Sequence, residues 1–268
     1  MHPLDGFSAP VARGSVRPGR RSIASAAVTV TLLVGLLTAA PARAGVEVES
    51  EAGVVFIGRN DVRIPGNGGT TQSLVDELTT DPAPAFRLRV GYRFARRHLV
   101  TALYAPLSVN ASGSVGRDVA FDGGTYPGGT PLLAVFRFDS YRLTYRYSIV
   151  RRDGLDVAAG LTAKIRDAEV SLYGAEARRK TNTGFVPLVN VHVAWRPKNG
   201  PFGVVLDADA LAAPQGRAED VLLAATWSFR PGVEVRVGYR MVEGGADNDE
   251  VYTFSWLHYV VAGLELSF

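Results

Sequence analysis

The 268-residue sequence contains no cysteine and only four histidines. The absence of cysteine excludes disulfide scaffolds, thiolate zinc sites and cysteine nucleophiles. After the first 44 residues, no apolar run approaches the roughly 18 residues that a membrane-spanning helix needs. Hydrophobic residues still make up 47% of the chain, so it has enough apolar surface to form a folded core.

The sequence also lacks a basic surplus outside its N-terminal segment. The formal net charge is +3, but residues 1–44 contain five arginines and one acid, Asp5. The other 224 residues hold 24 basic and 25 acidic side chains and are close to neutral. Nucleic-acid binding depends on a concentration of positive charge, so we predict no nucleic-acid partner.

The N-terminal segment has the three parts of a secretory signal peptide. An arginine pair ends a basic region at position 21, residues 23–40 form an apolar run, and residues 42–44 are a small-x-small cleavage site. We predict export, cleavage after Ala44 and a mature domain over residues 45–268. An uncleaved membrane anchor is the alternative, but Pro41 and the small residues after it favour cleavage. The arginine pair also fits a twin-arginine signal, although no cofactor motif downstream requires export in folded form.

Side-chain character alternates with a period of two through the mature chain. In residues 86–94, three aromatic and two aliphatic side chains share one parity, and three arginines and a glycine share the other. This pattern is typical of β-strands. Ten such segments are predicted: 46–58, 84–95, 98–112, 133–149, 155–172, 183–196, 203–211, 220–230, 233–242 and 251–268.

The connections between these segments alternate between long and short. Long loops rich in Gly, Asn, Asp and Pro cover 59–83, 113–132, 173–182, 212–219 and 243–250, and short turns cover 96–97, 150–154, 197–202 and 231–232. An even number of strands with long loops at one end and tight turns at the other is the layout of a transmembrane up-and-down antiparallel β-barrel. We therefore predict an all-β, single-domain barrel with both ends of the mature chain at the short-turn end.

A soluble barrel shows the same alternation, with the apolar side chains inside. Two features favour the inverse arrangement, in which the apolar parity faces lipid. The charged parity is rich in small residues and in potential ion pairs, as a narrow polar lumen requires. Aromatic residues also gather near strand ends, as in the girdles of membrane barrels: Phe94, Trp195, Phe229, Phe254 and Trp256.

The last predicted strand carries the most specific signal. Leu264, Leu266 and the C-terminal Phe268 alternate with polar residues and glycine. This strand resembles the terminal strand by which Gram-negative outer-membrane proteins are recognised for barrel insertion. The resemblance implies an outer-membrane location, contact with outer-membrane lipid and lipopolysaccharide, and the barrel assembly machinery as a partner. Segments 207–220 and 238–252 resemble those of an uncharacterised bacterial barrel family, which implies a fold and a location but no particular activity.

A ten-strand barrel has a narrow interior, because eight strands are nearly filled by side chains and water-filled channels have about sixteen. Isolated buried charges are costly, so we expect most lumen charges to pair across strands, for example Arg236 or Arg240 with an acid of the later strands. Two functions remain open, a structural barrel closed by ion pairs and a selective path for a small solute. The predicted lumen charge network is Arg87, Arg89, Arg93, Arg142, Arg146, Lys164, Arg166, Asp207, Asp209, Glu234, Arg236, Arg240 and Glu265, with Glu47, Glu49 and Glu51 on the first strand.

An outer-membrane enzyme, omptin-like or lipid-modifying, with a site at the extracellular rim is the alternative function. Such a site needs a base near a nucleophile or an activated water. His258 lies near this rim, and the acids of the neighbouring loops are Asp247, Asp249, Glu250, Glu219 and Asp220. Its parity, however, directs His258 towards lipid, and the mature chain has neither a Gly-x-Ser-x-Gly elbow nor a His-Glu-x-x-His helix. We therefore predict no catalytic residue, no metal site and no cofactor.

The sequence allows two positions for the loop over residues 59–83: it folds into the barrel or stays outside it. Its segment 71–78 contains Ser73, Asp76 and Glu77, and we expect one or two helical turns there.

Overall fold

The computed structural model describes residues 45–214 and 216–268. The predicted signal peptide and its cleavage site lie outside the described residues. In the part of the chain that the structure describes, no helix is long and apolar enough to cross a membrane.

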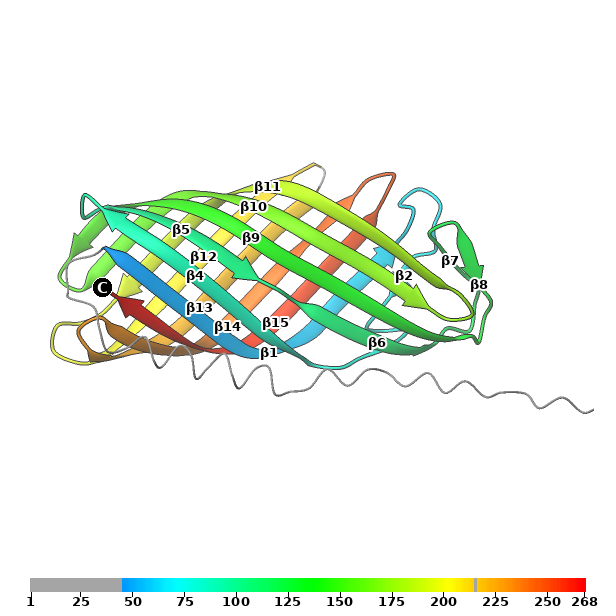
Figure 1. The fold of residues 1–268 in the computed structure, drawn as a ribbon, viewed down its shortest axis with the longest axis horizontal. Helices are drawn as coiled ribbons and strands as arrows, with labels where there is room; N and C mark the ends of the chain where they lie inside the picture. Colours follow the sequence, from blue (N-terminus) through cyan, green and yellow to red (C-terminus); the bar gives the residue numbers. More distant parts are fainter. Residues whose placement is uncertain (1–44, 215) are drawn as a thin grey trace, which may run out of the picture. The chain divides into compact units, whose positions relative to one another are not determined.

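The described residues form a closed antiparallel barrel of ten wall strands (Figure 1). Consecutive wall strands pair with each other, and β1 pairs with β15 to close the ring. The predicted fold class is therefore confirmed. The wall consists of β1 (Val46–Arg63), β4 (Ala83–Phe94), β5 (His98–Ala105) with β6 (Ser108–Ser114), β9 (Pro131–Arg152), β10 (Leu155–Tyr173), β11 (Ala177–Trp195), β12 (Phe202–Ala213), β13 (Gly216–Arg230), β14 (Val233–Asp247) and β15 (Tyr252–Ser267).

The third wall strand is interrupted once. The sequence predicts it as one segment over 98–112, but the structure divides it into β5 and β6 at Pro106 and Leu107. Proline has no backbone N–H to donate to a neighbouring strand, so regular pairing stops there. Both halves pair with β9, and the backbone N–H of Phe138 donates to the carbonyl of Leu107 across the break.

Several strands are longer at the long-loop end than the sequence predicts. β1 continues to residue 63 instead of 58, β11 begins at 177 instead of 183, and β14 continues to 247 instead of 242. The alternation of apolar and polar side chains marks a strand only where one face meets lipid. Beyond the apolar band the outward face is polar, so the pattern ends before the strand does.

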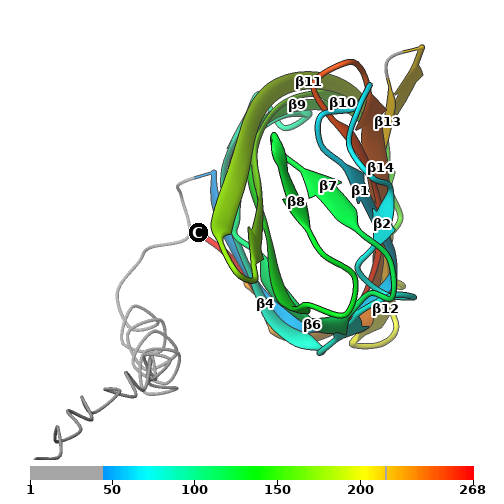
Figure 2. The ribbon, with the colours of Figure 1, turned by 90° about the vertical axis from the view of Figure 1, so that its right-hand side faces the viewer.

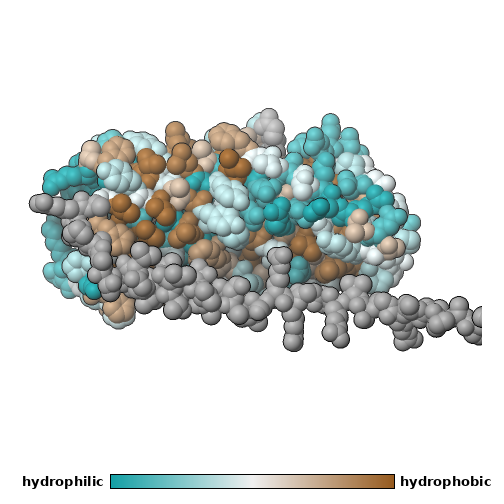
Figure 3. All heavy atoms as spheres, in the orientation of Figure 1, coloured by the Kyte–Doolittle hydropathy of each residue, from teal (hydrophilic) through white to brown (hydrophobic). Residues whose placement is uncertain are grey.

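The apolar parity of the wall faces outward. Leu161, Val237 and Val260 are more than half exposed, as are many aliphatic and aromatic residues of the same parity. In Figure 3 apolar residues gather over the middle and left of the face shown, and hydrophilic residues cover its right-hand end. Near the short turns, Phe202 stacks on Trp227, which contacts Phe229, as expected for an interfacial aromatic girdle.

The long-loop end is covered from within by an apolar cluster that we call the outer cap. Figure 2 looks onto this end and shows the hairpin of β7 (Val119–Phe121) and β8 (Gly124–Tyr126) lying across the opening. Burial raises the pKa of the Tyr126 hydroxyl, which donates to the carbonyl of Leu172 at 2.9 Å. The cap contains the buried residues Val62, Ile64, Leu74, Leu78, Ala111, Val115, Val119, Phe121, Tyr126, Leu132, Ala134, Phe136, Val170, Leu172 and Val251.

The loop over 59–83 contributes Leu74 and Leu78 to the outer cap, which decides between its two predicted positions in favour of the inward one. Of the one or two helical turns expected over 71–78, the structure has a single turn, in which the backbone N–H of Glu77 donates to the carbonyl of Ser73 at 3.2 Å. This turn lies between β2 (Gln72–Ser73) and β3 (Thr79–Thr80). Because β2 pairs with β1 and β3 pairs with β6, the chain is extended on both sides of the turn and a helix has no room to continue.

Candidate functional site: the barrel interior

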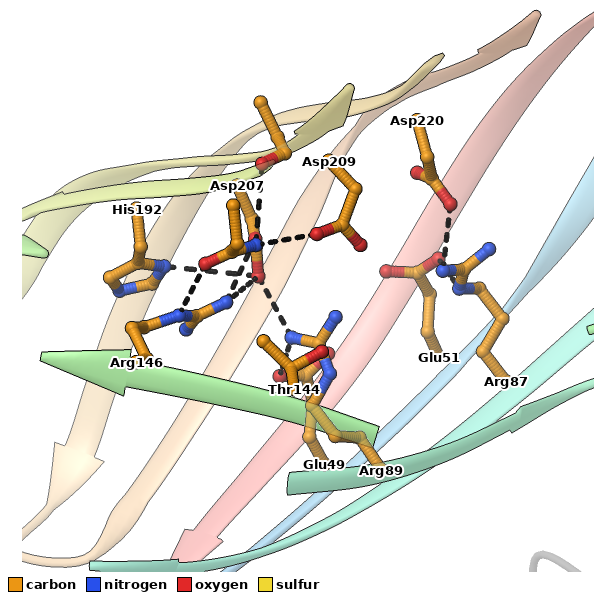
Figure 4. Close-up of polar contacts among 12 residues, drawn as sticks. Glu49, Glu51, Arg87, Arg89, Thr144, Arg146, His192, Asp207, Asp209 and Asp220 are labelled. Atoms are coloured by element: carbon orange, nitrogen blue, oxygen red, sulfur yellow. Dashed lines mark hydrogen bonds and ion pairs between the residues drawn. The ribbon is translucent and has the colours of Figure 1, made fainter. Parts of the chain in front are cut away.

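The middle of the barrel is crossed by a connected set of ion pairs, which we call the ion-pair belt. It has no counterpart on the outer surface, where the same strands are apolar. Its members come from β1, β4, β9, β12, β13 and β14, so it joins opposite parts of the wall (Figure 4). The belt consists of Glu49, Glu51, Arg87, Arg89, Arg142, Arg146, Asp207, Asp209, Asp220, Arg236 and Arg240.

One half of the belt is built around Arg240 and Asp220. Arg240 Nε and Nη2 donate to the two carboxylate oxygens of Glu51 at 2.8 and 2.9 Å, a bidentate arrangement. Asp220 accepts hydrogen bonds from Arg240 and from Arg87 at 3.0 Å, and it forms an ion pair with Arg142 at 2.6 Å. Three guanidinium groups thus share one carboxylate that is 3% exposed.

The other half of the belt is built around Asp207. Arg146 Nη2 donates to both oxygens of Asp207, at 2.9 and 3.0 Å, and Arg89 donates to it at 2.8 Å. The Asn190 side-chain amide links Asp207 to Asp209, at 3.2 and 2.8 Å. This amide therefore joins the two halves, because Asp209 also accepts from Arg142 at 2.8 Å.

The belt is close to electrically balanced. Six arginines meet five carboxylates, and most of these side chains are buried. Such a network is stable only when nearly every donor and acceptor is used, because an unpaired buried charge is costly. Every arginine of the belt contacts a carboxylate of the belt, so none of these six is left free to draw an anion along the axis.

Two cavities lie on either side of the belt. The one at the short-turn end, which we call the vestibule, has a volume of about 360 Å³ and is lined by the turn at Pro231 and Gly232. The other, which we call the side cavity, has a volume of about 430 Å³ and lies between the belt and the outer cap. In the described chain, no group of three or more His, Asp or Glu side chains is arranged to hold a metal ion.

The sequence-predicted lumen residues fall into three groups. The belt contains ten of them, and Arg236 and Arg240 contact Glu49, Glu51 and Asp220 in place of the acids expected on the later strands. In the vestibule, Arg93 pairs with Glu47 at 2.6 Å, while Glu234 and Glu265 both lie near Arg196. Lys164 and Arg166 line the side cavity and belong to neither network.

The sequence does not predict four members of these networks. They are Asp220 as a lumen charge, Asn190, Arg196, and Thr162, whose hydroxyl donates to Asp209 at 2.7 Å. The sequence-based prediction groups Asp220 with the rim acids, but Asp220 shares its parity with Leu222 and Ala224, which are both buried. This shared parity is the sequence signal that indicates an inward position for Asp220. Arg196 follows the last residue of β11, where alternation no longer applies, and the sequence holds no comparable signal for it.

The rim histidine does not form a catalytic group with the loop acids. His258 faces outward, its ring is tilted against that of Trp256 with centroids 4.7 Å apart, and its Nδ1 lies 2.6 Å from the hydroxyl of Tyr239. Asp220 is buried in the belt instead of lying at the rim. Within the part of the chain that the structure describes, His258 has no ion pair with a carboxylate.

The residues of the predicted assembly signal share one parity along β15 and the residue after it. Leu264 and Phe268 are partly exposed and Leu266 is buried, whereas Glu265 and Ser267 line the vestibule. The backbone N–H of Phe268 donates to the carbonyl of Val46 at 2.9 Å, so the end of the chain is tied to the first strand.

Comparison with solved structures finds barrels of the same kind. The outer-membrane protease OmpT from Escherichia coli is similar with a TM-score of 0.52 and 11% identity over 83% of this chain and 96% of OmpT. The transport unit of the autotransporter AIDA-I from Escherichia coli has a TM-score of 0.42 and 11% identity over 91% of this chain and 98% of that unit. The translocator domain of the autotransporter NalP from Neisseria meningitidis has a TM-score of 0.40 and 11% identity over 91% and 95%. No protein-family model and no curated protein matches the sequence. At 11% identity the likeness to OmpT carries the fold alone, and the chain has the fold of the bacterial outer-membrane β-barrels.

Proposed function

We propose that this chain is an outer-membrane barrel that does not conduct, because ion pairs and an apolar cap close its interior at two levels. Export by a signal peptide cleaved after Ala44 brings it to the envelope. Outer-membrane lipid and lipopolysaccharide surround it there, and the barrel assembly machinery inserts it. Its role is then that of a stable barrel that acts through its surfaces and cavities, without flow along its axis.

The observation that carries this proposal is the ion-pair belt. A through-going path would require the guanidinium groups around Asp220 and Asp207 to separate from their carboxylates. Breaking one buried pair costs about 3–5 kcal/mol, and the belt contains several in one connected network. The outer cap adds a second barrier that is apolar and therefore unfavourable for hydrated ions.

Planar-bilayer recording of the refolded mature protein tests the proposal. We expect no stepwise current at either polarity, while a sixteen-strand porin in the same bilayers gives large steps. A matched variant with the cap hairpin 118–127 replaced by a short glycine linker should also remain silent, because the belt stays in place. Small, reproducible steps in the unmodified protein would contradict closure and favour the second candidate, a selective path for a small solute.

A further inference from the structure

Two cations of β10, the buried Lys164 and the partly buried Arg166, differ from all the arginines of the ion-pair belt. Neither Lys164 nor Arg166 forms an ion pair with a carboxylate in residues 45–214 and 216–268. Lys164 is only 4% exposed, and its ammonium lies 5.0 Å from the ring centroid of Phe138. Arg166 donates to the side-chain oxygen of Asn182, and its Nε is buried without a hydrogen-bond partner among the described residues. A buried cation without an anion is costly, so these groups call for a partner.

The belt does not provide that partner. In the register of β9 and β10, Lys164 lies opposite Arg142, a residue of the same charge. Arg142 already contacts Asp209 and Asp220, which are the acids on that side of the belt. Lys164 is therefore a second cation beside Arg142, and the two carboxylates nearby already contact arginines.

Both side chains line the side cavity, which is otherwise mainly apolar. Its other charged side chains have partners: Glu169 with Arg137, Arg217 with Glu243, and Lys180 with Glu250. The apolar residues that line it include Phe136, Phe138, Phe185, Val242 and Leu257. A volume of about 430 Å³ falls within the range of roughly 300–1,000 Å³ that small-molecule sites occupy. The cavity thus combines a large apolar surface with two cations that lack anions.

The barrel wall is incomplete beside this cavity. β11 pairs with β12 only from Val189 to Trp195, while its first part, Ala177–Leu188, pairs with β10 alone. Pro187, which cannot donate to a neighbouring strand, stands at the boundary between the two parts. In Figure 2 the ends of β12 and β13 nearest the long loops project away from the barrel, beyond the point at which β11 and β12 stop pairing.

This gap in the pairing of β11 with β12 lies at the edge of the apolar outer surface that is nearer the long loops. Phe185 is 67% exposed and Ile165 is 49% exposed, and these two residues pair with each other across β10 and β11. The next outward pair is Asp167 and Thr183, which is polar. A molecule anchored in the membrane with its polar end at the interface would therefore meet this gap at the height of Arg166.

We propose that the side cavity binds a single-chain amphiphile with an anionic head, of the long-chain carboxylate type, which enters from the membrane between β11 and β12. The carboxylate pairs with Lys164 and Arg166, and the alkyl chain packs against Phe136, Phe138 and Leu257. The inference goes beyond a closed lumen, since the site is reached from the side and needs no axial path. A neutral or cationic amphiphile would leave Lys164 and Arg166 without an anionic partner.

Carbon-13 NMR of carboxyl-labelled dodecanoate tests this on the mature protein in phosphatidylcholine nanodiscs. We expect a protein-dependent carboxyl resonance that is absent from protein-free nanodiscs. Unlabelled dodecanoate should displace the bound labelled dodecanoate at a concentration at least tenfold lower than dodecanol or dodecyltrimethylammonium requires. Absence of this resonance, or equal displacement by all three amphiphiles, would overturn the proposal without any mutation.

Variants locate the site. Lys164→Met combined with Arg166→Gln should weaken dodecanoate binding at least tenfold, and Ala218→Leu, which narrows the cavity, should weaken it without a change of charge. Lys198→Met at the exposed turn is the matched control and should bind as the unmodified chain does. Binding that survives both cavity variants, in protein that still shows folded mobility on gels, would place the amphiphile elsewhere and refute the assignment. If bilayer recording finds a current while dodecanoate binds as expected, the proposal of a closed lumen is wrong and the proposed amphiphile site is retained.

Discussion

Arg240 illustrates what a single buried charge does in this barrel. It holds Glu51 on β1 and Asp220 on β13 at once, and both carboxylates are nearly inaccessible to water. We expect Arg240→Met to lower the free energy of unfolding by about 3–5 kcal/mol, because it leaves buried carboxylates without their counter-charge. Adding Glu51→Gln should then cost much less than the sum of the two single changes.

Urea unfolding of the refolded variants, followed by gel mobility, gives the double-mutant cycle. The control pair is Lys198 and Asp153, whose charged groups lie 2.7 Å apart and are 70% and 76% exposed. Changing either should alter stability by at most about 1 kcal/mol, because exposed pairs are screened by water. Additive losses for the belt pair, equal in size to those of the control pair, would show that the belt is not a coupled network.

The sequence predicts which residues point inward, but not which of them meet. Alternation along β14 is sufficient to place Arg236 and Arg240 inside, yet their partners Glu49 and Glu51 lie more than 180 residues away on β1. Partner choice depends on strand tilt and on the stagger between neighbouring strands, which fix the height of each residue in the barrel. A single sequence carries no local signal for that height.

At the scale of the element, β15 separates two roles that adjacent residues play. Ser267 lines the vestibule, whereas Phe268 lies on the opposite parity at the end of the chain. We expect Phe268→Asp to reduce the amount of folded barrel in cells strongly and Ser267→Asp to leave it nearly unchanged, because the assembly machinery is proposed to read the outward parity.

Refolding of purified protein into detergent distinguishes recognition from stability. A charge near the membrane interface costs only about 0–1 kcal/mol, so both variants should refold in vitro with similar yield. Equal yields in cells would count against the terminal-strand signal, and a refolding defect confined to Phe268→Asp would assign its role to packing.

Other elements were beyond the reach of the sequence for a different reason. Part of the outer cap is built from loop residues such as Leu74, Val119 and Phe121, which carry no periodic pattern because they lie in a turn or in a three-residue strand. The first part of β11, which pairs with β10 alone, is largely polar over 177–184, and its sequence gives no sign there that the neighbour on its other side is missing. Only Pro187 marks it, and a single proline in a strand indicates an edge or a bulge without saying which.

At the scale of the whole molecule, export and closure predict two observable properties. The mature protein should begin at Gly45 and fractionate with the outer membrane, which N-terminal sequencing and membrane fractionation check. It should also migrate faster in unheated than in heated gel samples, because a closed barrel has no free strand edge at which detergent can begin unfolding. Retention of residues 20–40, or recovery in the soluble fraction, would contradict the predicted export.

The pairing of β1 with β15 has a consequence for the order of assembly. Glu51 and Arg240 are 189 residues apart, and they meet only when the first and last strands join. Before that step the charged face of an open sheet is hydrated, and the free edges of β1 and β15 can pair with another chain. Joining them buries the acids of β1 among the arginines of β4 and β14 in one event. The barrel should therefore form cooperatively, with few half-closed intermediates, because a slipped register at this seam would strand charges that only the correct one neutralises.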